Sequence, residues 1–454
     1  LGLVGSEMCI RDSGLADPNA VWGMTQAAPE LVHWLLKLGV KFNMSGYDDV
    51  DLRNFGGQKK KRTAFAQSDT GKQIMTAMID AVRRKEASGM VERFSHHSFL
   101  TLRLCGNICC GCVIRDEYSQ ETVELPGDAV IVATGGMHGL FGNTTGSLSN
   151  TGEVTAELFR LGVPLANGEM IQYHPTTVKC GGKRMLISEA ARGEGGRLFA
   201  MKDGKQWYFM EEKYPELGNL MPRDITAREI WKVSHESEVF LDMTEISDEI
   251  ISNKLSGLAD DCMTYLHKDI RKEPVSVLPG IHYFMGGILV DEQHRTPIQN
   301  LYAAGECCAQ YHGANRLGGN SLLGALYGGR VAAKSACEQA DVVDLSCATQ
   351  IDFPPASQIS EIKQLNKVMQ ETMGVVRNEN TLLNGIQTVQ ALTGNLPLLG
   401  MAVLKSALAR KESRGAHWRE DYPKSNDDDY LKTTVARFDG KQIQISFVPV
   451  PERR

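Results

Sequence analysis

Two short apolar runs that each end in glycine constrain the fold of this chain most. Residues 128–133 read DAVIVA and precede TGG at 134–136, and residues 301–304 read LYAA and precede GE at 305–306. A buried parallel strand that ends in glycine is a common ligand-binding position in α/β sheets, because glycine lets the backbone approach a ligand closely. Either run alone is more typical of a core strand and a turn. Together they predict an α/β domain that binds a nucleotide cofactor, although the sequence has no GxGxxG motif to support simple NAD binding.

Composition excludes several classes of protein. The chain of 454 residues is long enough for about three domains. Its net charge of −6 and isoelectric point near 6.0 argue against nucleic acid as the main partner. No apolar run reaches the ~18 residues of a transmembrane helix, and the best candidate, 275–290, is interrupted by Pro279, Gly280 and His282. We therefore expect any membrane contact to go through another subunit.

Cysteine usage indicates a reducing compartment. The chain has 11 cysteines, an odd number without the framework of a small secreted domain. Cys105, Cys109, Cys110 and Cys112 cluster around a Gly-Asn pair in the alternating apolar run 99–114. This pattern predicts a β-hairpin in which cysteine acts as a small hydrophobic residue. The spacing fits no ligand pattern of a metal or iron–sulfur site well, so we assign no metal to the chain.

Three helices can be placed from local patterns. Residues 29–38 predict a helix with Pro29 in its first turn and Gly39 at its end, and residues 71–87 predict a second. A third helix is expected to begin at Asn320 or Ser321 as its N-cap and to run to about Glu338. Its first turns are small and apolar, and its N-terminus favours negative charge, such as that of a reduced flavin ring. The alternative is a close helix–sheet contact without a ligand.

The stretch 168–228 concentrates the side chains that can carry chemistry. Imidazole, hydroxyl, carboxylate and guanidinium groups occur there among glycines. Such a set can bind and protonate a small dianion, but arginine–glutamate pairs are also common on protein surfaces. Its significance therefore depends on two partners further along the chain. The candidates are His174, Ser188, Glu189, Arg192 and Arg223, with His282 and Arg316 as the partners.

Nine motifs in register resemble the flavoprotein subunit of the succinate dehydrogenase/fumarate reductase family, over residues 14–454. Each motif is weak alone, but nine in order are specific. The last two favour the branch with a helical C-terminal domain. The motifs are ATGG (133–136), QYHPT (172–176), SEAARGEGG (188–196), PRD (222–224), HYFMGG (282–287), YAAGE (302–306), HGANRLGGNSLL (312–323), VVRNE (375–379) and ESRGAHWREDYP (412–423).

The resemblance implies three parts. An incomplete, Rossmann-like α/β FAD-binding domain would comprise residues 14–167 and 276–354, an α+β capping domain 168–275, and a helical C-terminal domain with its tail 355–454. Residues 1–13 resemble a translated sequencing adapter, and we exclude them as an artefact. The family opens with a βαβ unit that carries a glycine-rich ADP loop, which has no counterpart in this sequence. We therefore expect an N-terminally truncated member that binds FAD poorly.

The resemblance also implies FAD-linked interconversion of succinate and fumarate. Arg223 matches the arginine that exchanges a proton with the substrate carbon, with Glu189 and Arg192 as its relay. The residues that match substrate-binding positions are His174, Ser188, His282, Arg316 and, in a looser alignment, Phe42. The residues that match FAD contacts are Thr134, Gly135, Gly136, Glu153, Glu306, Asn320, Ser321 and Leu322.

The residue types suit this chemistry. Fumarate carries two carboxylates, which need arginine and histidine donors at both ends. While a hydride passes from flavin N5 to one carbon, a proton must reach the other. An arginine can deliver it if it is desolvated and linked to Glu189, although its pKa normally exceeds ~12. Two positions depart from the family pattern: Ser188 replaces a threonine but keeps the hydroxyl, and a TGDG motif has lost one glycine next to Glu153.

The family implies electron transfer to an iron–sulfur subunit and through it to a membrane anchor. That arrangement would place the chain on the cytoplasmic face of the cell membrane as a peripheral subunit. L-Aspartate oxidase, which shares the flavin and dicarboxylate motifs, is the main alternative. A truncated fragment without catalytic activity is the other.

Overall fold

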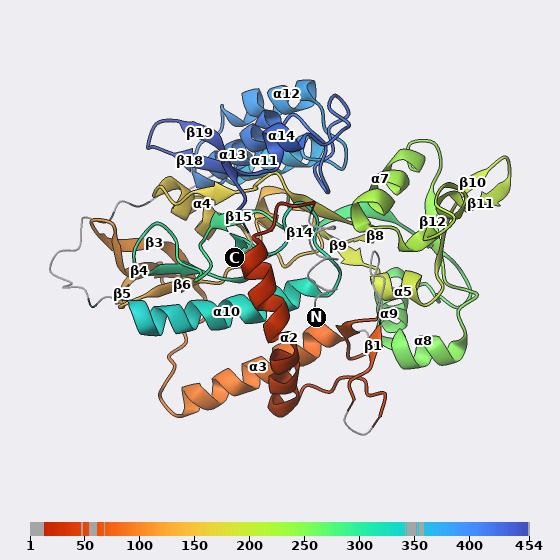
Figure 1. Ribbon diagram of the computed structural model, residues 1–454, viewed down its shortest axis with the longest axis horizontal. Coiled ribbons are helices and arrows are strands. Elements are labelled where there is room, and N and C mark those ends of the chain that lie inside the picture. Colours follow the sequence, from red (N-terminus) through yellow and green to blue (C-terminus); the bar gives the residue numbers. More distant parts are fainter. Residues whose placement is uncertain are drawn as a thin grey trace.

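The computed structural model describes residues 13–46, 49–53, 61–67, 69–340 and 358–452, with the single positions 342, 351 and 353. Residues 1–12 of the expected artefact and the predicted domain boundary at 354–355 lie outside them. Figure 1 shows an α/β part crossed by α10 (Asn320–Gln339), a yellow and green cap, and a blue helical C-terminal part. The predicted fold class is confirmed, whereas the exact domain boundaries stay predictions.

The two strands predicted to end in glycine both form, and they lie side by side. β6 (Val130–Val132) and β16 (Leu301–Ala303) pair in parallel, with Leu301 opposite Val130. The N–H of Ala304 donates to the carbonyl of Val132 at 2.9 Å, which extends the pairing by one residue. Because parallel strands end at the same edge of a sheet, the segments that follow β6 and β16 are brought together.

Two larger sheets also belong to the α/β part. β3 (His97–Cys105) and β4 (Ile108–Asp116) form the predicted hairpin, which β5 (Thr122–Pro126) extends. Burial raises the pKa of the Cys109 thiol to about 11, so that this side chain stays protonated within the sheet. The other sheet has the order β17-β15-β7-β18-β19. Its strands are β7 (Leu165–Ala166), β15 (Gly287–Leu289), β17 (Cys308–Ala309), β18 (Lys432–Phe438) and β19 (Ile443–Pro449).

Among the helices on the lower side of Figure 1, one begins earlier than the sequence predicts. α2 (Pro18–Leu38) begins eleven residues before the predicted start, because Asp17 caps it and Pro18 occupies its first turn. Pro29 therefore lies inside the helix, while Gly39 ends it as predicted. α3 (Thr70–Ala87) matches its prediction. The remaining short elements of this part are β1 (Leu52–Arg53), β2 (Thr63–Ala64), η1 (His138–Leu140), α4 (Glu153–Arg160) and η4 (Gly305–Cys307).

The cap has its own hydrophobic core, which includes Ile187, Leu198, Ile230 and Leu241. Its first sheet is β8 (Ile171–Cys180) between β14 (Leu278–Phe284) and β9 (Lys183–Leu186). Its second sheet contains β10 (Arg197–Lys202), β11 (Lys205–Trp207), β12 (Val239–Asp242) and β13 (Val275–Ser276). The helices are α5 (Glu189–Gly193), α6 (Phe209–Lys213), η2 (Gly218–Leu220), α7 (Arg223–Val233), α8 (Asp248–Lys254), α9 (Ser256–Asp261) and η3 (Cys262–Leu266).

The C-terminal part packs α11 (Ile359–Thr372), α12 (Glu379–Val389) and α13 (Asn395–Ala409) on one core with residues of α4 and β8. The short α14 (Asp427–Tyr430) follows, and then β18 joins β7, with Val435 opposite Ala166. The tail is thus part of a sheet of the α/β part. None of the helices formed by the described residues is long and apolar enough to cross a membrane.

A buried charge network joins the C-terminal part to the start of β8. Arg410 donates from Nε to Glu169 and from Nη1 to Glu412, both at 2.7 Å, and all three side chains are fully buried. Arg377 donates to the carbonyl of Glu169 at 2.7 Å. Glu169 lies two residues before β8, so this network fixes the chain where the strand begins.

We predict that Arg410→Ala destabilises the protein by about 3–5 kcal/mol, because it leaves buried carboxylates without their partner. Denaturant unfolding measures the effect, with Arg437→Ala on the exposed side of β18 as the control. A midpoint for Arg410→Ala that coincides with that of the control would contradict a structural role for the network.

Candidate active site

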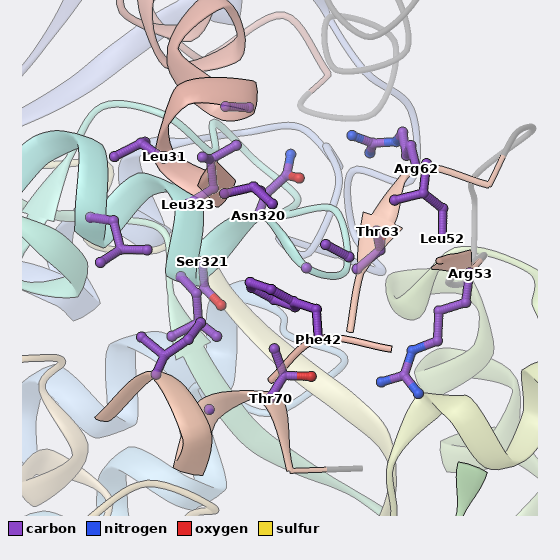
Figure 2. A pocket seen from close by; sticks show the side chains of 18 of the residues that line it. Leu31, Phe42, Leu52, Arg53, Arg62, Thr63, Thr70, Asn320, Ser321 and Leu323 are labelled. Carbon is purple, nitrogen blue, oxygen red and sulfur yellow. The ribbon is translucent and has the colours of Figure 1, made fainter. Parts of the chain in front are cut away.

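A cavity of about 690 Å³ lies where α2, α3 and α10 face the cap. Part of its wall is apolar: Figure 2 shows Phe42 pointing toward Ser321 of α10, with Leu31 and Leu323 beyond. Another part is polar and contains most of the residues predicted to act in catalysis or to bind the substrate. These are His174, Ser188, Glu189, Arg223, His282 and Arg316. Arg192 does not line the cavity but lies behind Glu189.

Local structure explains how the acid and the arginine reach the wall. The Ser188 hydroxyl caps α5 by accepting from the N–H of Ala190 at 3.3 Å, and Glu189 is therefore the first residue of that helix. Arg223 is the first residue of α7, directly after Pro222 in an extended conformation. The first residues of α5 and α7 thus bring a negative and a positive charge together.

Glu189 holds two arginines. Its Oε2 accepts from Nη2 and Nε of Arg223 at 2.7 and 3.1 Å, and its Oε1 accepts from Nη2 of Arg192 at 3.1 Å. All three side chains are buried. Burial alone would raise the pKa of the Glu189 carboxyl, but Arg223 and Arg192 outweigh it and lower the pKa to about 2. Glu189 is therefore ionised at neutral pH.

Gln172 also binds the Arg223 guanidinium, a role that was not predicted from the sequence. Its Oε1 accepts from Nη1 of Arg223 at 2.9 Å, and its Nε2 donates to the carbonyl of Arg316 at 2.7 Å and to Oδ1 of Asn315 at 3.1 Å. Its position two residues before His174 on the same strand could have revealed it, because residues i and i+2 share a face. Gln172 therefore links the Arg223 guanidinium to the backbone of Arg316.

Two histidines face each other across the site. The rings of His174 and His282 meet edge to face, with centroids 5.2 Å apart. Burial lowers the pKa of His174 well below its usual value, and Arg223 and Arg192 lower it further. Burial likewise lowers the pKa of His282, aided by His174 and Arg223. Both imidazoles are therefore neutral and can each donate one hydrogen bond.

Arg316 provides a further positive charge. Its guanidinium lies 4.4 Å from the ring centroid of Tyr283, and its Nε has no hydrogen-bond partner among the described residues. Burial lowers the pKa of Arg316 to about 9, and Arg223 adds to this effect. At neutral pH the group is still charged. A buried guanidinium with unused hydrogen-bonding capacity is suited to an anionic ligand.

The start of α7 is held from two sides. The Asn315 amide donates to Oδ1 of Asp224 at 2.9 Å. One turn further on, the Arg228 guanidinium lies 4.0 Å from the ring centroid of Trp418 in the C-terminal part. These contacts position Arg223 from outside the cap.

The predicted cofactor residues form two groups. A Cβ at Gly136, four residues after β6, would lie 2.6 Å from the Phe284 ring and 2.7 Å from Oε1 of Glu306, so glycine lets the backbone pack closely against both side chains. Thr134, Gly135, Gly136 and Glu306 lie together at the strand ends, outside the cavity lining. Glu153 is exposed in the first turn of α4 and does not line the cavity either. Its predicted contact with the cofactor stays a prediction.

The second group is the first turn of α10, where Asn320, Ser321 and Leu322 line the cavity. Its N-cap is Gly319, with φ of 83° and no side-chain cap, so the predicted cap at Asn320 or Ser321 is wrong. A helix N-terminus that faces a cavity attracts negative charge, and carboxylates such as Glu306 accept from hydroxyl groups. The residues present therefore fit a flavin nucleotide.

Comparisons with known families agree with this geometry. The model described as "FAD binding domain" matches residues 10–322, and the model described as "Fumarate reductase flavoprotein C-term" matches residues 392–453. The first match covers more than half of the chain and identifies FAD as the cofactor.

Individual relatives point the same way. The chain is 35% identical to the succinate dehydrogenase flavoprotein subunit of Bacillus subtilis, over 97% of this chain and 86% of the relative. It is 32% identical to the L-aspartate oxidase of Pyrococcus furiosus, over 91% and 82%. The quinol fumarate reductase structure of E. coli matches with a TM-score of 0.89 at 25% identity, covering 99% of this chain and 86% of that one. The chain therefore belongs to the succinate dehydrogenase/fumarate reductase flavoprotein family.

Proposed function

We propose that this chain interconverts fumarate and succinate with FAD, as the flavoprotein subunit of a respiratory complex. The observation that carries the proposal is the position of Arg223. Its guanidinium lies in the cavity wall, with Glu189 and then Arg192 directly behind it. Four further groups suited to carboxylates line the same cavity: His174, Ser188, His282 and Arg316.

The charge of the site favours a dianion. Glu189 neutralises only one of the two arginines that it holds, and Arg316 adds another positive charge. The neutral histidines supply hydrogen bonds without adding charge. A small dicarboxylate would therefore exchange its hydration for charge-assisted hydrogen bonds at both ends.

Arg223 is the group best placed to exchange the proton. FAD, when bound, supplies or accepts the hydride. Reduction of fumarate then needs one proton at the other carbon, which Arg223 releases and regains through Glu189 and Arg192. The ionised Glu189 can take up a proton and pass it on, and the direct hydrogen bonds between these side chains give it a short route.

The complex is a proposal from family membership. The relatives from Bacillus subtilis and Wolinella succinogenes are named flavoprotein subunits. We propose an iron–sulfur subunit as the partner and, through it, a membrane anchor on the inner face of the cell membrane. Co-purification of the protein with an iron–sulfur subunit from its native cells tests this assignment.

L-Aspartate oxidase activity is the second candidate, since a relative of that name is 32% identical over 91% of this chain. A turnover assay separates the two. Fumarate with a reduced dye should be consumed, whereas aspartate with oxygen should not. If the protein turns over aspartate but not fumarate, L-aspartate oxidase activity replaces the proposed function.

We predict that Arg223→Ala abolishes turnover of fumarate while the affinity for malonate changes little, because the lost interaction acts in the transition state. Arg223→Lys should keep a small activity with a shifted pH profile, since lysine donates a proton with a lower pKa. Steady-state kinetics and separate malonate titrations measure both effects. Arg271→Ala, at an exposed ion pair of the cap, is the control. Near-normal turnover of Arg223→Ala with only a raised Michaelis constant would remove the proton-donor role.

A second prediction concerns binding. Arg316→Ala and His282→Ala should each weaken the binding of malonate, a dicarboxylate, by about 2–4 kcal/mol, because a buried carboxylate of the ligand loses a hydrogen-bond donor. Equilibrium titration of the FAD-loaded protein measures this loss. Unchanged malonate affinity in Arg316→Ala would exclude Arg316 from the site.

A further inference from the structure

The orientation of His282 depends on one hydroxyl group. His282 lies in β14 and lines the cavity. Its Nδ1 is 2.9 Å from Oγ1 of Thr145, 137 residues earlier in the chain. Nε2 makes no hydrogen bond to any residue that the structure describes. Because Nδ1 is occupied by Thr145, Nε2 is the nitrogen available to a ligand.

Thr145 is itself fixed to the strand that carries the histidine. Its N–H donates to the carbonyl of Ile281 at 3.0 Å, and its Oγ1 lies 3.3 Å from the same oxygen. The neighbouring Thr144 accepts at its carbonyl from the N–H of Arg184 at 2.9 Å. This segment is therefore pinned between β9 and β14, and the Thr145 hydroxyl has two acceptors in reach, Nδ1 and the Ile281 carbonyl.

The choice between these acceptors decides what His282 can offer. A neutral imidazole carries one N–H. If the hydroxyl donates to Nδ1, the ring proton is on Nε2 and can be donated to a carboxylate. If the hydroxyl donates to Ile281, Nδ1 keeps the proton and Nε2 presents a lone pair, which repels a carboxylate. The shorter contact is the one to Nδ1, and the Ile281 carbonyl already accepts from the backbone.

Protonation of both ring nitrogens does not settle which tautomer forms, because the ring is neutral at neutral pH. Burial keeps the pKa of His282 low, and the charges of His174, Arg223, Arg316 and His138 lower it further. His282 can therefore serve as a donor at neutral pH only in the Nε2–H form.

We propose that Thr145 is a positioning residue of the dicarboxylate site, whose hydroxyl donates to Nδ1 of His282 and so fixes the Nε2–H tautomer that a substrate carboxylate requires. The inference rests on the proposed function and adds a residue to it. His174 is held differently: the carbonyl and the N–H of Thr176 lie 3.1 and 3.3 Å from its Nδ1, both nearer than the Thr176 hydroxyl at 3.5 Å.

Malonate titration of the FAD-loaded protein tests the inference. Thr145→Val should lower the affinity for malonate roughly three- to tenfold, as expected for one lost hydrogen bond. Thr145→Ser, which restores the hydroxyl, should recover most of the affinity. Thr372→Val is the matched control, since that threonine is also hydrogen-bonded to a carbonyl but lies in α11.

A double-mutant cycle shows whether Thr145 acts through His282. In a His282→Ala background, Thr145→Val should cause no further loss. An equal loss in both backgrounds, or normal affinity of Thr145→Val, would overturn the inference.

The tautomer can also be observed without a ligand. Nitrogen NMR of protein labelled with [15N]histidine, with His282→Ala to assign the signal, should place the ring proton on Nε2. A proton on Nδ1 would overturn the inference. If the wild-type protein bound no malonate, the proposed function would fail, while these spectra would still decide the role of Thr145.

Discussion

A single buried carboxylate, Glu189, holds Arg223 at the cavity wall and Arg192 behind it, and most of the geometry of the site follows from these contacts. Charged groups are stable away from water only when they are paired and hydrogen-bonded. Glu189 meets this condition for itself, with three hydrogen bonds from Arg223 and Arg192. It leaves an excess of positive charge, which Arg316 increases. The unpaired charge is the reason why the cavity suits an anion.

The surrounding fold serves to place these few charges. Glu189 and Arg223 begin two different helices of the cap, whereas Arg316 comes from the loop before α10. Gln172 ties the last two together, and it lies on β8, whose start is fixed by Glu169. Because Arg410 of the C-terminal part holds Glu169, the buried network of that domain reaches the site through the backbone of one strand.

The sequence predicted the elements whose pattern is local. The paired strands, the cysteine hairpin and α3 follow from runs of apolar residues and turn signals, and resemblance supplied the site residues that the structure brings together. The start of α2 was missed because Pro29 looked like a first-turn residue, while the cap at Asp17 decides. Gln172 and Thr145 were missed for another reason. Thr145 contacts His282, 137 residues away, and no local pattern records such a hydrogen bond. The spacing of Gln172 to His174 was a local signal, but its hydrogen bond to Arg316, 144 residues away, was not.

The central claim is that the cavity recognises two carboxylates at once. Calorimetric titration of the FAD-loaded protein with succinate and with butyrate, an acid of equal chain length with one carboxylate, tests it most directly. The account predicts that succinate binds at least about 100-fold more tightly, since butyrate leaves one set of buried donors without an anion. Equal affinity for the two acids would contradict the account.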